Sequence, residues 1–128
     1  MRVLLRGVPL TVPAGTEVTF KVSLLNGTAT DQRLTLPSGK HFSFFVTDPT
    51  GRRVLDAEEG SFFTQALTPL DVAAGDEVRL GKVTWAVPTN APPGVYHAHA
   101  AVEAMDGRWE TDATFEIPPA DRPGHELG

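Results

Sequence analysis

The sequence contains no cysteine, which excludes both a disulfide framework and a zinc site built on thiolates. Long apolar runs are missing too. The run within residues 1–10 is far too short for a signal peptide or a membrane span, and no later stretch approaches spanning length. We therefore expect a cytoplasmic protein with no membrane contact, stabilised by packing alone.

Positive charge is scarce as well. Lys and Arg number 11 against 16 Asp and Glu, which leaves a net charge of -5, and the basic residues are scattered. Nucleic-acid binding needs basic residues in excess on one face, so no nucleic-acid partner is expected. With 128 residues, 41% of them hydrophobic, the chain is nevertheless long enough to form one domain with its own core.

Helical periodicity is the third absence. The chain has 12 Gly and 11 Pro at intervals, and no stretch between them keeps a helical repeat for long enough to form a helix. A period of two is clear instead, as where Val18, Phe20, Val22 and Leu24 alternate with polar residues. We expect strands over residues 2–8, 17–25, 34–36, 42–47, 53–55, 67–72, 78–87, 96–103 and 109–117.

Turn signals separate these strands. Asn26-Gly27 offers the positive φ angles of a tight turn, and residues 48–51 place Pro second and Gly fourth, as a type I turn prefers. Asp106-Gly107 predicts a hairpin. The inward positions change parity across Gly81, which indicates a β-bulge there.

Regularly spaced short strands with such turns predict an all-β fold, an immunoglobulin-like antiparallel β-sandwich of about eight or nine strands without a disulfide. Trp85, Tyr96 and the Phe residues must then fill the space between the sheets. The Tyr96 hydroxyl is expected to tie a corner of the chain to backbone. The domain should span residues 1–118, and the polar residues 119–128 should form a flexible C-terminal tail.

Chemistry-bearing motifs are few. His97 and His99 have a spacing that metal sites use, but no third ligand is evident, and we interpret them as outward residues of a half-exposed strand. The acidic residues near position 58 lack the spacing of a calcium loop. No nucleophile elbow or phosphate-binding loop occurs. We expect no enzyme activity, cofactor or metal; an enzyme or metal protein using the two His residues is the alternative.

Residues 56–65 have no strand pattern and include the adjacent Phe62 and Phe63. Two neighbouring residues in a loop cannot both face one sheet interior. Two interpretations stay open: one Phe plugs the sandwich end while the other covers it, or at least one is presented to a partner, because loops on rigid scaffolds carry function.

A series of motifs resembles the BsuPI family, the intracellular proteinase inhibitors of bacilli and related domains. Each motif is weak alone, but their order and spacing over most of the domain are specific. In chain order they are LLN at 24–26, LTLPSG at 34–39, FSFFVTD at 42–48, Gly51, VL at 54–55, FTQAL at 63–67, AGDE at 74–77, Trp85 and PGVY at 93–96.

This resemblance implies a protein that blocks a cytoplasmic subtilisin-like serine protease through loops at one end of the sandwich. Such proteases favour large apolar anchors. The candidate protease-contact residues are Phe62, Phe63, Thr64, Gln65, Leu67, Pro92 and Pro93. The alternative is a non-inhibitory interaction or assembly module, in which an exposed strand edge or the face bearing Phe45 pairs with another chain.

Strand direction predicts which loops share an end. If consecutive strands alternate in direction, one end of the sandwich carries the loops at 9–16, 38–40, 57–66 and 88–94. The other end then carries the loops at 26–31, 48–52, 73–76 and 106–107. The predicted contact loops, 57–66 and 88–94, would therefore lie together.

Overall fold

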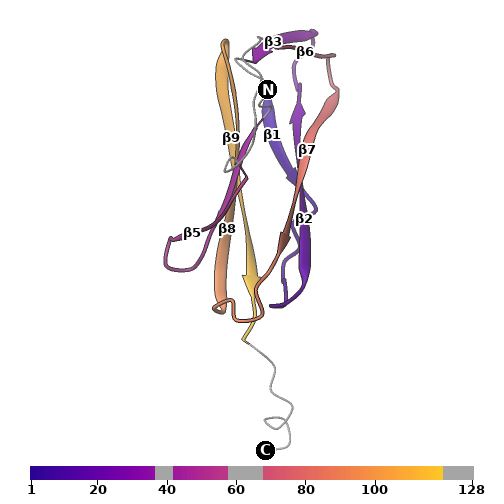
Figure 1. Ribbon diagram of the computed structural model, residues 1–128. Helices are drawn as coiled ribbons and strands as arrows, with labels where there is room; N and C mark the ends of the chain where they lie inside the picture. The colour runs from indigo at the N-terminus through magenta and orange to yellow at the C-terminus, as the bar shows by residue number, and fades with distance from the viewer. Residues whose placement is uncertain (37–41, 58–67, 120–128) are drawn as a thin grey trace, which may run out of the picture.

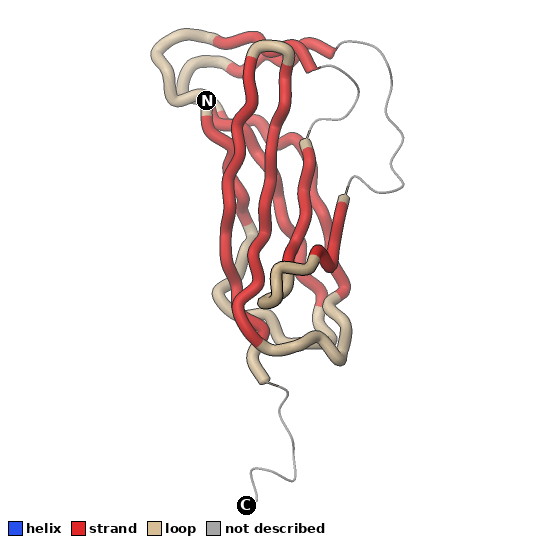
Figure 2. Tube along the Cα trace, turned by 90° about the vertical axis from the view of Figure 1, so that its left-hand side faces the viewer, coloured by secondary structure: helices blue, strands red, loops and turns tan. Residues whose placement is uncertain are grey.

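The computed structural model describes residues 1–36, 42–57 and 68–119, and it is all-β as predicted (Figures 1 and 2). The described residues form nine strands in three antiparallel sheets and contain no helix. Two of the sheets form the layers of an elongated sandwich, and the third lies across one end. The described part of the chain contains no helix that could cross a membrane.

The first layer contains β1 (Arg2–Arg6), β2 (Glu17–Leu25) and β7 (Glu77–Ala86), with β2 in the middle. Strand β2 has the predicted bounds, and its inward residues are buried because successive side chains of a strand point to opposite faces. The register between β2 and β7 shifts where Gly81 is followed by Arg79 as the next paired residue, so Leu80 is the extra residue. The bulge predicted near Gly81 is therefore confirmed.

The second layer has the order β5 (Arg53–Asp56), β4 (Ser43–Thr47), β8 (Gly94–Ala104) and β9 (Gly107–Ile117). The hairpin between β8 and β9 is present, but Ala104 pairs with Gly107. Its two loop residues are therefore 105 and 106, one position earlier than predicted.

Strands β3 (Gln32–Leu36) and β6 (Thr68–Val72) pair only with each other and lie across one end of the sandwich, at the top of Figure 1. Because they do not run its length, the chain enters β4 from the same end at which it left β2. Consecutive strands therefore do not all alternate in direction. The prediction that the loop 48–52 lies opposite the loop 88–94 is wrong: Thr47 pairs with His97, at the start of β8.

We name the two ends by residues that organise them. The Asn26 end carries the loops 26–31, 73–76 and 105–106, and the Tyr96 end carries the loops 9–16, 48–52 and 88–93. Of the loop 57–66, the structure describes Ala57, whose amide donates to the Phe44 carbonyl, away from the Tyr96 end. The loop 38–40 lies outside the described residues.

Aromatic rings fill the space between the layers, as predicted. Phe20 lies 4.9 Å from Phe44 and 5.8 Å from Phe115, measured between ring centroids. Towards the Tyr96 end, the Phe115 ring stacks on Tyr96 at 5.6 Å, and Trp85 lies 6.1 Å from Tyr96. Packing of these large apolar rings takes the place of the disulfide that many sandwiches of this kind have between their sheets.

Two further expectations have different outcomes. Asn26 and Gly27 do not form a turn with positive φ; Asn26 is instead completely buried and holds the loop through its side chain. The predicted tail, 119–128, lies outside the described residues except for Pro119.

Candidate functional site: the Tyr96 end

The loops 48–52 and 88–93 meet at the Tyr96 end because β4 and β8 are hydrogen-bonded neighbours. Gly94 has a φ of +138°, and a Cβ atom built on it would lie 2.6 Å from Pro49 Cγ. This contact brings the two loops against each other and leaves no room for a side chain at Gly94. The neighbouring loop 9–16 is joined to the end of β7 by the Gly15 amide, which donates to the Val87 carbonyl at 3.0 Å.

Asp48 organises the first of these loops. Its Oδ1 atom accepts hydrogen bonds from the Thr50 hydroxyl at 2.6 Å and from the amides of Thr50 and Arg52, both at 2.9 Å. The predicted turn is closed by the Gly51 amide, which donates to the Asp48 carbonyl. The Thr50 hydroxyl, followed by the two amides and the Arg52 charge, lowers the pKa of the buried Asp48 carboxyl, although burial acts against them.

Tyr96 fixes the second loop. Its hydroxyl donates to the Pro92 carbonyl at 2.7 Å, which confirms the predicted tie between this tyrosine and the backbone of a corner. The ring is buried in the aromatic core, so the loop is anchored to the most tightly packed part of the domain. Burial raises the pKa of the hydroxyl, and the negative charge of Asp48 adds to this effect.

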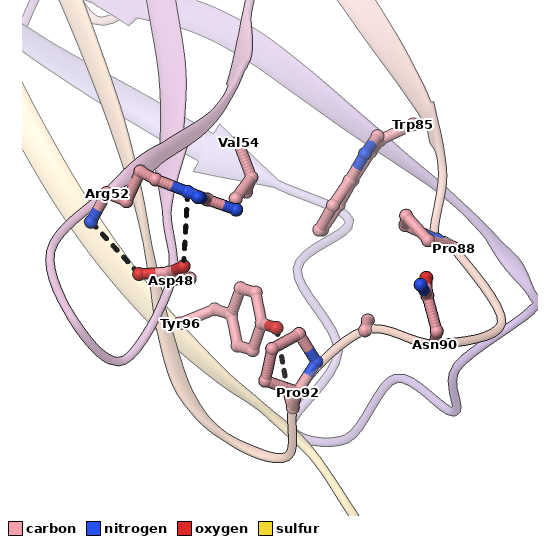
Figure 3. A pocket seen from close by; sticks show the side chains of 9 residues that line it. Asp48, Arg52, Val54, Trp85, Pro88, Asn90, Pro92 and Tyr96 are labelled. Atoms are coloured by element: carbon pink, nitrogen blue, oxygen red, sulfur yellow. Dashed lines mark hydrogen bonds and ion pairs between the residues drawn. The ribbon is translucent and has the colours of Figure 1, made fainter.

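A hollow of about 300 Å³ lies between the two loops (Figure 3). Its floor is aromatic and apolar, with the rings of Trp85 and Tyr96 facing it and Val54 at one side. The ion pair between Arg52 and Asp48, 4.0 Å apart, lies at its rim. The remaining lining residues are Pro88, Asn90, Ala91 and Pro92.

This arrangement suits binding of an apolar side chain with a polar neighbour, because apolar hollows with a few placed polar groups fix both affinity and orientation. Pro92 and Pro93, two of the predicted contact residues, are exposed at this end, and Pro92 lines the hollow. The other predicted contact residues, Phe62, Phe63, Thr64, Gln65 and Leu67, lie outside the described residues.

Sequence reasoning missed three residues of the hollow. Asp48 and Arg52 belong to a turn motif and gave no functional signal, and Trp85 was expected only as core filling. The pairing of β4 with β8 brings Asp48 and Arg52 beside the loop 88–93, and Trp85 reaches the hollow from the opposite layer; no local pattern reveals either. Pro49, at the second position of the turn, is the one residue of the sequence signal that takes part in this meeting of loops, because it packs against Gly94.

The outer face of the second layer holds a different cluster. The Phe45 ring lies 4.8 Å from the His99 ring, measured between centroids. The Arg53 guanidinium lies over the same Phe45 ring, 3.9 Å from its centroid. His99 Nδ1 is 2.5 Å from Asp112 Oδ1. Phe45 is therefore half-buried by its own sheet, and His99, predicted as a solvated residue, is largely covered. No three metal-ligating side chains come together within the described residues.

The fold is a small β-sandwich in which buried side chains fix the loops 48–52 and 88–93 at one end. The model of the BsuPI family, described as intracellular proteinase inhibitor, matches residues 10–107. The chain therefore belongs to the BsuPI family, as its motifs indicated. Because this is a family of inhibitors, the expectation that the chain is not an enzyme is confirmed.

Solved structures include distant matches to this chain. A family 123 glycoside hydrolase from Clostridium perfringens matches with a TM-score of 0.50 and 14% identity, covering 88% of this chain and 23% of its own. Spo0M, a sporulation control protein from Bacillus subtilis, matches with a TM-score of 0.49 and 12% identity, covering 92% of this chain and 48% of its own. No curated protein matches the sequence.

Proposed function

We propose that this chain binds and blocks a subtilisin-like serine protease of the cytoplasm, and that the Tyr96 end supplies a contact surface. The supporting observation is the fixation of the loops 48–52 and 88–93 by two buried side chains, Asp48 and Tyr96. Inhibitors bind tightly when their contact segment already has its bound conformation, since little entropy is then lost on association. Here hydrogen bonds and packing provide the rigidity that disulfides provide in many small inhibitors.

Pro92 and Pro93 fit this role. Proline restricts its own φ angle and has no amide hydrogen, so a Pro-Pro segment is stiff before binding. The hollow beside them would receive an apolar side chain of the protease, and its aromatic floor would form the centre of the interface. Centres of this kind, formed by desolvated aromatic residues, contribute most of the affinity of protein interfaces.

We propose a second contact region in Phe62, Phe63, Thr64, Gln65 and Leu67. Its basis is the sequence: two adjacent Phe residues stand in a segment without strand pattern, and large apolar anchors suit a subtilisin-like cleft. Ala57 leads away from the Tyr96 end, so we treat this region as separate from the hollow. Each region needs its own variant.

The first test fills the hollow. Ala91→Trp adds bulk among the lining residues, and its control, Met105→Trp, places the same indole side chain at an exposed position of the Asn26 end. With subtilisin as the probe, we expect Ala91→Trp to weaken inhibition at least tenfold, about 1.4 kcal/mol, and Met105→Trp to leave it unchanged. Equal inhibition by both variants would remove the Tyr96 end from the interface.

The second test replaces Phe62 and Phe63 together by Ala. Loss of inhibition with an unchanged thermal unfolding temperature would assign the anchor to this pair. If neither the wild-type chain nor any variant slows a subtilisin-like protease, the inhibitory function itself is refuted. Capture of a different class of protein by the wild-type chain would then favour the non-inhibitory interaction module.

A further inference from the structure

The two layers are joined along one side by a partial strand pairing. Residues 10–12, which follow β1, run parallel to the end of β9: the Glu116 amide donates to the Leu10 carbonyl at 2.9 Å, and the Val12 amide donates to the Glu116 carbonyl at 2.8 Å. Nearer the Asn26 end, β1 pairs with β2 in the first layer and not with β9. The seam between β1 and β9 is therefore closed at the Tyr96 end and open towards the Asn26 end.

Backbone groups of β9 face the open part of this seam. In an antiparallel pair, alternate residues direct their amide and carbonyl towards the neighbouring strand and the residues between them direct theirs away. The amide and carbonyl of Glu116 point away from β8, towards residues 10–12. The amide and carbonyl of every second residue before Glu116 therefore also point away from β8. These residues are Arg108, Glu110, Asp112 and Thr114. No backbone hydrogen bond to any of the four exists within the described part of the chain.

Burial along β9 shows the same opening. Phe115 and Ile117 face inward beside the closed part and are 2% and 0% exposed. Trp109, Thr111 and Ala113 face the same way but are partly exposed. A groove of about 380 Å³ lies beside them, with one wall formed by residues 1–4 and the other by residues 108–111.

The open edge of β9 has little protection against pairing. Its register with β8 runs over eleven residue pairs without a shift, and β9 contains neither Pro nor Lys. The edge strand β7, in contrast, has a bulge at Leu80 and carries Arg79 and Lys82. Bulges, Pro and charged side chains, Lys above all, are the features by which proteins prevent an edge strand from pairing. The β9 edge lacks a bulge, Pro and Lys, and its charged residues Arg108, Glu110 and Asp112 restrict which strand it can receive.

Charge argues against a second copy of the chain as that strand. Two β9 edges can pair symmetrically in several antiparallel registers. Every register that engages three or more of the four edge residues places Glu110 opposite Glu110, Glu110 opposite Asp112, or Asp112 opposite Asp112. Like charges directly opposite each other destabilise a strand pair. The register centred on Glu110 also places Arg108 opposite Asp112, which offsets that repulsion, whereas a strand that is neutral or basic opposite Glu110 and Asp112 avoids the repulsion in every register.

We propose that the β9 edge, residues 108–114, receives an extended segment of another protein as an added strand. The segment carries a basic or neutral residue opposite Glu110 and opposite Asp112. The residues between these point inward and are apolar, since they cover the partly exposed row from Trp109 to Ala113. Backbone hydrogen bonds supply affinity in this mode of recognition, and the alternating side chains supply specificity. The proposal is independent of protease inhibition through the Tyr96 end.

The probe is a short, end-capped peptide of alternating valine and lysine, and the measurement is amide hydrogen exchange. On saturation with peptide we expect exchange at Glu110 and Asp112 to slow at least about tenfold, because their amides become hydrogen-bonded. The amides of Thr111 and Ala113 already face β8 and should not change. A peptide with glutamate in place of lysine should bind at least about tenfold more weakly, because acidic residues then oppose Glu110 and Asp112.

A variant pair isolates the backbone. Glu110→Pro removes the edge amide and is compatible with an edge strand, and Glu110→Ala removes the same side chain but keeps the amide. We expect the first to abolish peptide binding and the second to keep it. Because the Pro variant could fail to fold, a peptide N-methylated at alternate residues tests the same bonds against the wild-type chain, and it should not bind in the register that uses those amides.

Three results would overturn the proposal. The first is absence of protection at Glu110 and Asp112 with saturating peptide. The second is peptide binding that is unaffected by both Glu110→Pro and N-methylation. The third is protection of the same amides by self-association at rising protein concentration without peptide, which would assign the edge to a second copy of the chain.

Discussion

The two ends of the sandwich are each held by one buried polar side chain, but the two side chains differ in charge. At the Asn26 end, the neutral amide of Asn26 donates to the carbonyls of Thr30 and Val72 and accepts from the amide and hydroxyl of Thr28. At the Tyr96 end, the carboxylate of Asp48 only accepts. A buried polar group is tolerated when it is hydrogen-bonded, and within the described residues no buried side-chain nitrogen or oxygen lacks a hydrogen-bond partner.

The two ends also differ in how many independent contacts hold their loops. The Asn26 side chain bonds to its own loop and to Val72 at the end of β6, and its backbone bonds to the 73–76 loop, so the Asn26 end is a single connected unit. Asp48 holds its own loop alone, and Tyr96 and the Gly94–Pro49 contact join that loop to its neighbour. The Tyr96 end is therefore rigid through several separate contacts, each of which can be altered without dismantling the others.

The largest effect is expected from Asn26→Ala. The substitution leaves the Val72 carbonyl without its donor in a buried site and removes the acceptor of two Thr28 hydrogen bonds. An unsatisfied buried group costs about 1–3 kcal/mol, and each further hydrogen bond that is lost costs about 1 kcal/mol. We expect a loss of about 3 kcal/mol in the free energy of unfolding, measured by urea denaturation. The matched control, Asn90→Ala at the exposed Tyr96 end, should change stability by less than about 0.5 kcal/mol. Equal midpoints for both variants would contradict the central role of Asn26.

Gly94→Ala should have the next largest effect. The new Cβ would clash with Pro49 Cγ, and the φ of +138° is strained for any other residue, so a loss of about 2 kcal/mol is expected. Gly51→Ala is the control: its φ is +88°, but nothing lies within 4 Å of the new Cβ, so it should cost about 1 kcal/mol. If the two variants lose equal stability, the contact between the loops does not matter.

Tyr96→Phe keeps the ring and removes the bond to the Pro92 carbonyl. A net loss of about 1 kcal/mol is expected in calorimetry, since one buried hydrogen bond is lost and the aromatic packing is kept. The effect on inhibition sharpens the comparison of the ends: if the loop 88–93 contacts the protease, inhibition should weaken in proportion to the loop's mobility. Unchanged amide exchange at Ala91 would show that other contacts fix the loop.

The smallest expected effect is a local loss of stability at the Asp48 loop when the pH is lowered. The folded-state pKa of Asp48 is lower than its ordinary value of 3.8, so the ionised carboxylate stabilises the fold above that pH. This stabilisation is lost as the pH falls through the lowered folded-state value. Amide exchange at Thr50 and Arg52, corrected for intrinsic rates, should accelerate over that range, and exchange at Thr28, bound to neutral Asn26, should not. Asp48→Asn should remove the difference.

Much of the fold is predictable because the signals are local. Inward alternation identified the buried residues of β2 and β8, including Phe20 and Ala100, and Tyr96 was expected to tie a corner. Strand direction was not predictable, since it depends on β3 and β6 pairing with each other across the end of the sandwich. The hollow at the Tyr96 end was therefore missed, and the contacts of Phe45 with His99 were missed for the same reason.

The sequence by itself determined the class of fold, the family and the turn at 48–51, because these depend on neighbours along the chain and on the order of motifs. Tertiary structure alone decided which loops meet, which polar residues become buried, and which strand edge stays open. Those outcomes depend on pairings between residues far apart in the chain. Asp48 shows the difference: the sequence marks it as the start of a turn, and only the pairing of β4 with β8 places it at the rim of a hollow.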